Sequence, residues 1–318
     1  MPSIITTHRL KKQYNPPDGP LAVNGIDLEI EEGEVFSLLG PNGAGKTTTI
    51  SILSGLITPT EGEAVIAGHD IIKEPMAAKR MIGVVPQEIA LYPRLSARQN
   101  LRFFGQLYGL SGRALNKAVD EVLDFIDLTD RADDKVETYS GGMKRRVNIG
   151  VGLLHKPKVV YMDEPTVGID PQSRRRILDA VIELKEKQGM TVLYTTHYME
   201  EAQELSDRVG IIDHGKIIAL GTTGELIQMI GEEDQLRLRV DEQNIPAAVL
   251  EAFRHVEGVT NVIHQDGEIT VTAKRGRRAL PDLITLANEA GVDISSVAVQ
   301  EPDLEAVFLH LTGRALRE

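Results

Sequence analysis

The stretch Gly40-Pro41-Asn42-Gly43-Ala44-Gly45-Lys46-Thr47 decides the fold of this chain. It fits the pattern of a glycine, four residues and then Gly-Lys-Thr, and it lies between an apolar strand pattern over residues 34–39 and a helical pattern over residues 48–56. That order is the context which a phosphate-binding loop requires. Glycines let successive backbone N–H groups face phosphate oxygens, and the N-terminus of the following helix adds partial positive charge. The stretch therefore predicts an α/β nucleotide-binding domain, although a glycine-rich turn that only caps a helix is the alternative.

Within this loop, two side chains have the chemistry that a bound nucleotide needs. We expect the Lys46 ammonium to bridge the β- and γ-phosphates, and the Thr47 hydroxyl to ligate Mg²⁺.

An acidic pair follows a second apolar run. Residues 159–162 read Val-Val-Tyr-Met, as a parallel strand buried on both faces would, and Asp163-Glu164 come directly after them. Ligands of open α/β sheets lie at the carboxyl ends of the strands. We expect Asp163 to hold the Mg²⁺ shell and Glu164 to orient or deprotonate a water that attacks the γ-phosphate. The alternative is that the acidic pair caps a helix or lies in a solvated turn.

Two further polar residues follow strand patterns. His197 comes directly after the apolar pattern of residues 191–196, and Gln87 follows residues 82–85 and a proline. If these strands are parallel, both side chains lie at the same sheet edge as the acidic pair. We expect His197 to contact the γ-phosphate and Gln87 to reach the metal or the attacking water.

Residues 139–146, Tyr-Ser-Gly-Gly-Met-Lys-Arg-Arg, place a Ser-Gly-Gly turn before a basic helix. The turn suggests a second phosphate-binding surface, directed at a nucleotide held by another copy of the protein. The basic runs over residues 144–146 and 174–176 are either solvated helix faces or contacts to a nucleotide or a partner.

Together these motifs resemble those of an ATP-binding-cassette ATPase, the nucleotide-binding subunit of an ABC transporter, over residues 3–225. The resemblance implies catalytic roles for Lys46, Gln87, Glu164 and His197, and Mg²⁺ ligation by Thr47, Gln87 and Asp163. It also implies that Tyr14 stacks on the adenine of ATP. The phosphates would be bound by Gly40, Pro41, Asn42, Gly43, Ala44, Gly45, Lys46, Thr47 and Thr48. The same ATP would be contacted from across an interface by Ser140, Gly141, Gly142 and Asp170. Tyr14 adjoins a proline-rich loop, so an exposed loop aromatic is the alternative for that residue.

The signature segment departs from the usual Leu-Ser-Gly-Gly-Gln at Tyr139 and Met143. This form is similar to the cassettes of daunorubicin-resistance-type exporters. The resemblance implies a head-to-tail homodimer with ATP at its interface, acting with separate transmembrane subunits from the cytoplasmic face of the membrane. One alternative function is that of a soluble ABC ATPase which acts on ribosomes or nucleic acid. Another is that of a nucleotide-binding regulator which hydrolyses ATP slowly. The interval between Lys46 and Ser140 is too short for a long coiled coil, which disfavours chromosome-maintenance relatives.

Composition agrees with the transport interpretation. The formal net charge of −12 argues against a general nucleic-acid binder, and no nucleic acid is expected as a partner. The chain has no cysteine, so neither a disulfide nor a thiolate metal site is available. No apolar stretch approaches the roughly 18 residues that a membrane span needs, and no basic and then apolar leader begins the chain. A membrane pore would therefore come from another chain.

With 318 residues, two domains are expected. We predict a nucleotide-binding domain over residues 1–230, with antiparallel edge strands over 4–10 and 21–30 and a helical subdomain at about 88–156. Aromatic residues over 103–108 belong either to its core or to an interface with a membrane partner. Residues 231–318 follow a β-α-β-β-α-β order, with a turn at Asp266-Gly267, and predict a small α+β ferredoxin-like accessory domain. Residues 301–308 resemble the terminal motif of exporter cassettes.

Overall fold

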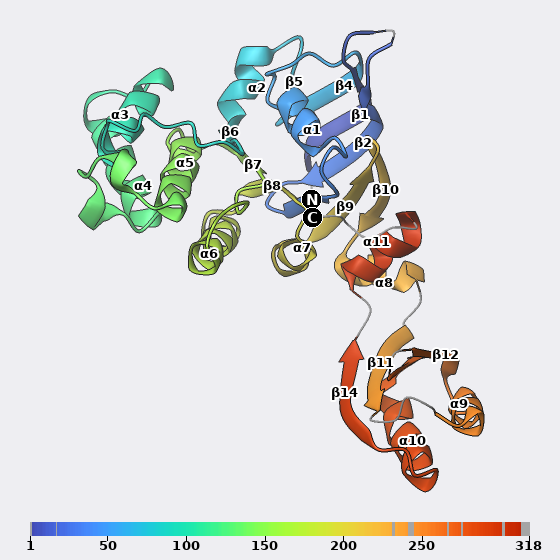
Figure 1. The fold of residues 1–318 in the computed structure, drawn as a ribbon. Coiled ribbons are helices and arrows are strands. Elements are labelled where there is room, and N and C mark those ends of the chain that lie inside the picture. The colour runs from blue at the N-terminus through green and yellow to red at the C-terminus, as the bar shows by residue number, and fades with distance from the viewer. Residues whose placement is uncertain are drawn as a thin grey trace. The chain divides into compact units, whose positions relative to one another are not determined.

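The computed structural model of this chain describes residues 2–16, 18–230, 233–240, 245–265, 267–274, 276–300 and 303–312. The chain divides into two compact units, Met1–Thr222 and Thr223–Ala315 (Figure 1). The boundary predicted at residues 230 and 231 follows the helix α8 (Thr223–Ile230), whereas this division precedes it. Three residues named in the sequence analysis, Asp266, Glu301 and Pro302, lie outside the described residues.

The first unit is built on a six-stranded sheet in the order β10-β9-β3-β8-β7-β6. Its strands are β3 (Val35–Leu39), β6 (Ile82–Val85), β7 (Val159–Asp163), β8 (Thr191–Thr196), β9 (Arg208–Asp213) and β10 (Lys216–Gly221). All neighbouring pairs are parallel except β9 with β10. The predicted strand ends at Gln87, Asp163 and His197 therefore meet at one edge of the sheet.

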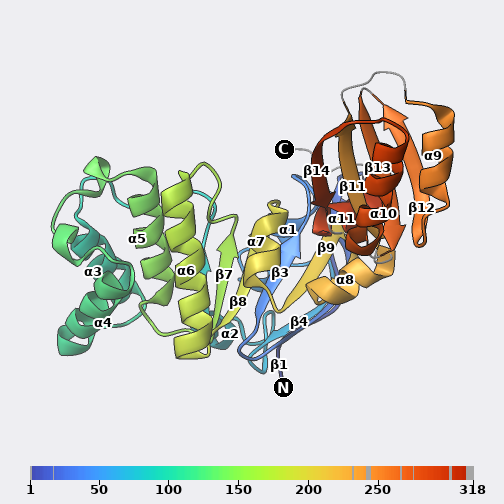
Figure 2. The same ribbon diagram turned by 90° about the horizontal axis from the view of Figure 1, so that it is seen from below.

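Each central strand contributes to two hydrophobic cores, because side chains alternate between the two faces of a sheet. On β7, Val160 and Met162 belong to the core that includes helix α6 (Pro171–Gln188), whereas Val159 and Tyr161 belong to the core that includes helix α1 (Lys46–Leu53). Helix α7 (Met199–Leu205) lies beside α6, on the face opposite α1 (Figures 1 and 2). Burial on both faces confirms the interpretation of the continuous apolar runs.

A four-stranded antiparallel sheet, ordered β2-β1-β4-β5, packs over α1 in the same core. Its strands are β1 (Ser3–Gln13), β2 (Leu21–Glu31), β4 (Glu61–Ile66) and β5 (His69–Asp70), and α2 (Pro75–Met81) follows them. The two predicted antiparallel strands are confirmed. β1 is not an edge strand as expected, because β4 pairs with it on the side away from β2.

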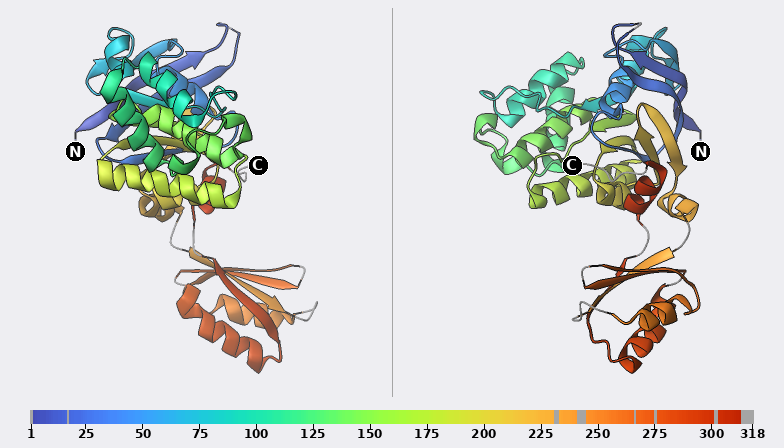
Figure 3. Two further views of the ribbon diagram at one scale, coloured as in Figure 1. Left: turned by 90° about the vertical axis from the view of Figure 1, so that its left-hand side faces the viewer. Right: turned by 45° about the vertical axis from the view of Figure 1, so that its right-hand side comes forward.

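Helices form a separate lobe of the first unit between β6 and β7 (Figure 3, right). They are α3 (Ala97–Leu107), α4 (Gly112–Phe125) and α5 (Gly141–Leu153), with short 3₁₀ turns over Thr129–Arg131 and Val136–Thr138. A capping box between Ser96 and Gln99 starts α3. Of the aromatic cluster, Phe104 packs on the core, whereas Leu107 is 69% and Tyr108 42% exposed.

The basic run at the start of α5 is not a solvated face. Arg145 and Arg146 are 3% and 8% exposed, and both guanidinium groups donate hydrogen bonds to backbone carbonyl oxygens. Arg146 Nη1 donates hydrogen bonds to Ile126 O and Asp127 O, at the C-terminal end of α4, over distances of 2.6 Å and 2.9 Å. The solvated-face interpretation is therefore wrong for these two residues. In the other run, Arg175 and Arg176 are exposed and pair with acidic side chains.

The second unit contains an antiparallel sheet in the order β12-β13-β11-β14, with helices α9 and α10 on one of its faces (Figures 1 and 3). Its elements after α8 are β11 (Glu233–Val240), α9 (Ala247–Arg254), β12 (Val259–Gln265), β13 (Glu268–Lys274), α10 (Gly276–Glu289), β14 (Ile294–Gln300) and α11 (Leu304–Thr312). The strand order and the β-α-β-β-α-β sequence confirm the ferredoxin-like prediction. Helix α11 packs against α8.

None of the helices in the described ranges is both long enough and apolar enough to span a bilayer.

Candidate active site

The loop between β3 and α1 has a backbone that only glycine adopts without strain at two positions. Gly43 and Gly45 have φ angles of 80° and 109°, in the left-handed region. A Cβ on Gly45 would lie 2.4 Å from Ala22 O, and one on Gly40 would lie 2.2 Å from Ile212 O. The glycine spacing of the motif is therefore required both by the loop's conformation and by close approach of other strands.

Lys46, the first residue of α1, is buried at the base of this loop. Its Nζ donates to Gly40 O at 2.7 Å and to Pro41 O at 3.0 Å. Glu164 Oε1 lies 2.9 Å from the same nitrogen, and both side chains are about 5% exposed. The loop thus holds a buried ammonium group directly opposite the acidic pair.

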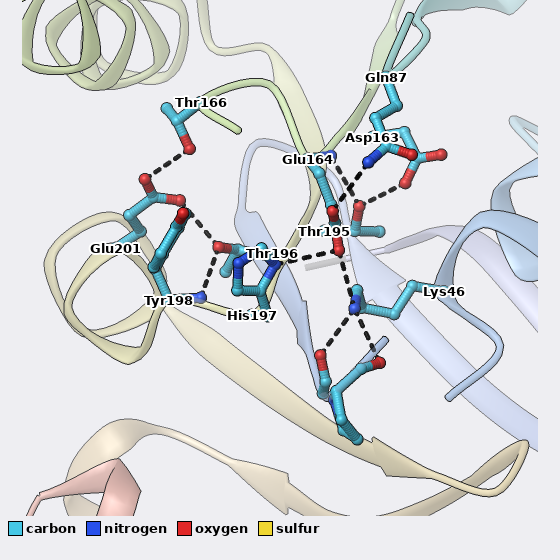
Figure 4. Close-up of polar contacts among 12 residues, drawn as sticks. Lys46, Gln87, Asp163, Glu164, Thr166, Thr195, Thr196, His197, Tyr198 and Glu201 are labelled. Atoms are coloured by element: carbon cyan, nitrogen blue, oxygen red, sulfur yellow. Dashed lines mark hydrogen bonds and ion pairs between the residues drawn. The ribbon is translucent and has the colours of Figure 1, made fainter. Parts of the chain in front are cut away.

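Glu164 is the point where the predicted catalytic residues meet (Figure 4). Besides Lys46, it accepts a hydrogen bond from Gln87 Nε2 at 3.1 Å through Oε2, and His197 Nδ1 lies 3.3 Å from its Oε1. Its φ angle of 43° places a non-glycine residue in the left-handed region. Such strain is maintained only where surrounding contacts fix the backbone. Four side chains from four separate segments, at residues 46, 87, 164 and 197, therefore converge as the sequence predicted.

Opposing influences set the ionisation of Glu164. Burial raises the pKa of its carboxyl, but the hydrogen bonds and charges of Lys46 and His197 outweigh burial, so the net pKa lies below the ordinary value. The carboxylate is consequently ionised at neutral pH and able to accept a proton.

Thr195 of β8 orients both members of the acidic pair. Its hydroxyl donates to Asp163 Oδ1 at 2.7 Å and accepts from the Glu164 backbone N–H at 3.0 Å. Asp163 is 4% exposed. The hydroxyl fixes one carboxylate oxygen of Asp163, and the backbone hydrogen bond fixes the turn that directs Glu164 toward Lys46.

A cavity of about 560 Å³ opens over these groups. It is lined by Tyr14, Pro20, Ala22, Asn42, Gly43, Gly45, Lys46, Thr47, Thr48, Gln87, Glu164, Val167 and His197. The predicted adenine contact, Tyr14, therefore lies on the same cavity as the phosphate loop. The residue is 38% exposed, and Lys12 Nζ lies 5.5 Å from the centre of its ring. Pro20, Ala22 and Val167 also form part of this wall, although no motif of the sequence predicts them there.

The signature residues and Asp170 do not line this cavity. Ser140 is the exposed N-cap of α5 and accepts from Met143 N at 3.2 Å. Asp170 caps α6 by accepting from Ser173 N at 2.9 Å. Gly142 packs against the start of α6, where a Cβ would meet Ser173 Oγ at 2.0 Å. The Ser-Gly-Gly turn is thus a second surface, separate from the cavity of its own chain.

Known proteins share this combination of motifs. The family model described as ABC transporter matches residues 23–167. The chain is 47% identical over 317 residues to the linearmycin resistance ATP-binding protein LnrL of Bacillus subtilis (strain 168), covering 99% of this chain and 100% of that protein. It is 40% identical over 311 residues to the daunorubicin resistance ATP-binding protein DrrA3 of Streptomyces coeruleorubidus, covering 97% and 96%.

The first unit also has solved counterparts. A dimeric ATP-binding cassette in a post-hydrolysis state, bound to ADP and Pi, matches with a TM-score of 0.63 at 28% identity, over 69% of this chain and 98% of that one. Fold, site geometry and full-length similarity agree, and the predicted resemblance is confirmed. The chain therefore belongs to the ABC transporter family, as one of its ATP-binding, ATP-hydrolysing subunits.

Proposed function

We propose that two copies of this chain close head to tail around Mg²⁺-ATP and drive export through separate membrane subunits. The observation that carries this proposal is the convergence of Lys46, Gln87 and His197 on Glu164, together with the signature turn on a different surface. The first set forms one wall of an ATP site. A second copy would supply the other wall.

Within one copy, phosphate and Glu164 compete for Lys46. The ammonium lies 2.9 Å from Glu164 Oε1, and incoming phosphate oxygens replace that carboxylate as its partner. Glu164 is then free to accept a proton from the water that attacks the γ-phosphate in line. His197 and Gln87, which contact the two carboxylate oxygens, hold Glu164 and the water in place.

Thr47, Gln87 and Asp163 would hold Mg²⁺, because hydroxyl, amide and carboxylate oxygens are the ligands that this ion prefers. Thr47 and Gln87 line the cavity. Asp163 is buried and does not line it, and Thr195 orients one of its carboxylate oxygens. When bound, the ion neutralises charge on the phosphate oxygens.

Ser140, Gly141 and Gly142 would complete the phosphate cage of the opposite copy. They form the N-terminal end of α5, where a serine hydroxyl and unpaired backbone N–H groups are available to an anion. Only the γ-phosphate touches both surfaces, so ATP stabilises the closed dimer and hydrolysis removes that stabilisation. Tyr14 would stack on the adenine and Asp170 would approach the partner's site.

Export is the direction that the relatives favour. Both named relatives are resistance ATP-binding proteins, and an ATPase gives resistance most directly by driving a toxic compound out of the cell. Transport thus has support that a ribosomal or nucleic-acid function lacks. The exposed Leu107 and Tyr108 of the helical lobe form an apolar surface on which a membrane subunit could dock at the cytoplasmic face.

Replacing Glu164 by glutamine tests the catalytic core of this proposal. The amide keeps the shape of the side chain but cannot take a proton, so Glu164→Gln should lower ATP turnover by about 100-fold or more. Because ATP still binds, size-exclusion chromatography with Mg²⁺-ATP should detect a stable dimer. Glu32→Gln, an exposed glutamate, is the matched control and should behave as the wild type. A monomeric Glu164→Gln variant, or one with full turnover, would contradict the proposal.

A further inference from the structure

Glu201, on α7, is a buried carboxylate that the mechanism does not use. Its side chain is 0% exposed. A carboxylate removed from water is costly unless other groups donate hydrogen bonds to it. Glu201 must therefore have a compensating set of partners.

Four donors converge on the two oxygens of this carboxylate. Two of them, the hydroxyl groups of Thr166 and Thr196, are drawn in Figure 4. Oε1 accepts from Thr166 Oγ1 at 2.6 Å and from Arg174 Nε at 2.7 Å. Oε2 accepts from Tyr194 OH at 2.9 Å and from Thr196 Oγ1 at 2.8 Å. Burial and the neighbouring Glu201 charge raise the pKa of Tyr194, so its hydroxyl remains a donor.

These donors belong to segments that carry the reaction. Thr166 lies two residues after Glu164, Arg174 is in the first turns of the helix that Asp170 caps, and Thr196 directly precedes His197. Glu201 thus joins the turn after β7, the start of α6 and the end of β8 around one charge.

The same cluster reaches the histidine ring by two routes. Thr196 Oγ1, while donating to Glu201, accepts from the Tyr198 backbone N–H at 2.9 Å and so fixes the backbone on both sides of His197. The Arg174 guanidinium lies 4.5 Å from the centre of the Tyr198 ring, and that ring lies 4.2 Å from the His197 ring. His197 in turn contacts Glu164.

We propose that Glu201 is a positioning residue for His197, and that through Arg174 it couples the position of that histidine to the turn capped by Asp170. Glu201 acts through its neighbours, because none of its hydrogen-bond partners is a catalytic residue of the site. The inference rests on the role proposed above for His197, and not on the dimer, the metal or the direction of transport.

Glu201→Gln tests the inference with little change in shape. The amide removes the charge that holds Arg174. Its NH₂ group also replaces one carboxylate oxygen, so that it faces the two donors whose hydrogen bonds that oxygen accepted. We expect kcat for ATP, measured per nucleotide-binding molecule, to fall about tenfold. KM should change less than twofold, because the phosphate loop makes none of these contacts. In a His197→Ala background the same change should alter residual turnover less than twofold, since no ring is left to position.

Glu204→Gln is the matched control, because Glu204 is on the same helix and also pairs with an α6 arginine, Arg175, but at an exposed site. It should keep wild-type kcat. If Glu201→Gln does not fold, Thr166→Val removes one of the four donors and should give a smaller fall in kcat with unchanged KM. The inference is overturned if the folded variant matches Glu204→Gln in kcat, or if its effect is equally large without the histidine.

Discussion

At the scale of single residues, Glu164 is the side chain on which the contacts of the site converge. Its left-handed backbone, at a φ of 43°, costs on the order of 1–3 kcal/mol in a residue with a side chain. Lys46, Gln87 and His197 stabilise the carboxylate in the resulting position. The contacts that hold Glu164 in the position proposed for catalysis therefore also link its ionisation to the stability of the fold.

The lowered pKa of Glu164 gives a pH dependence of stability with a definite sign. Because the pKa of the folded state lies below the ordinary value of 4.5, the ionised carboxylate stabilises the fold at pH values above 4.5. That contribution is lost as the pH falls below 4.5 through the pKa of the folded state. Urea midpoints of the nucleotide-free protein from pH 7 to pH 3.5 should fall more steeply for the wild type than for Glu164→Gln.

Glu32→Gln provides the comparison for that titration, since it removes an exposed carboxylate. Its midpoints should parallel those of the wild type. Equal slopes for the wild type and Glu164→Gln would show that the pair with Lys46 does not contribute to stability.

At the scale of elements, α5 has two roles that the sequence did not separate. Its N-terminal turn presents Ser140 to Gly142, while its buried side chains hold the segment that contains Gln87. Arg145 Nη1 donates to Pro86 O at 2.6 Å and Nη2 donates to Gln87 O. Asn148 adds a hydrogen bond from Ala90 N at 3.3 Å. Displacement of α5 should therefore displace Gln87.

Arg145→Lys tests this link. Lysine keeps the charge but lacks the planar fork that reaches two carbonyl oxygens at once. We expect amide hydrogen exchange over residues 87–90 to accelerate by about tenfold, because one hydrogen bond of about 1.4 kcal/mol is lost. The displacement of Gln87 should also lower kcat several-fold. Arg102→Lys, on the surface of the same lobe, should change neither quantity. Unchanged exchange over residues 87–90 would exclude the link.

At the scale of the whole molecule, the cavity and the Ser-Gly-Gly turn lie on different surfaces of one copy. The cavity over Lys46 and Glu164 includes none of Ser140, Gly141 and Gly142 among its lining residues. Under the proposed function a complete site would require two chains, and one of the similar solved structures is a dimeric cassette. The second unit has a hydrophobic core of its own. Nowhere in the described part of the chain do three or more His, Asp or Glu side chains gather as a metal site would require.

Mixing two inactive variants tests whether the half-sites combine across chains. Lys46→Met disables the phosphate loop, and Ser140→Arg blocks the signature turn. A heterodimer of the two contains one doubly damaged site and one intact site, so an equimolar mixture should recover up to about a quarter of the wild-type turnover if the variants pair at random and sites act independently. Each variant alone should show almost none. An inactive mixture that still forms heterodimers would indicate that both motifs act within one chain.

Much of this architecture could be predicted before the structure. The apolar runs predicted the parallel strands, because a strand that is buried on both faces has no alternation of apolar and polar residues. Gln87, Glu164 and His197 were identified because they are polar residues that follow these runs. Strand pairing was harder: β1 was expected at an edge, yet β4 covers it, since pairing partners distant in sequence leave no local pattern.

The sequence by itself determined the cassette, the glycine loop and the residues at the strand ends, because these depend on local backbone conformation and on regular burial. Only the tertiary structure decided which of two similar neighbours is buried. Glu201 is enclosed by four donors while Glu200 is exposed, and Arg145 is bound to carbonyl oxygens while Lys144 is only partly buried. The two residues in each of these pairs have the same charge and similar helix propensities. Their environments differ because segments far apart in sequence pack against one and not the other.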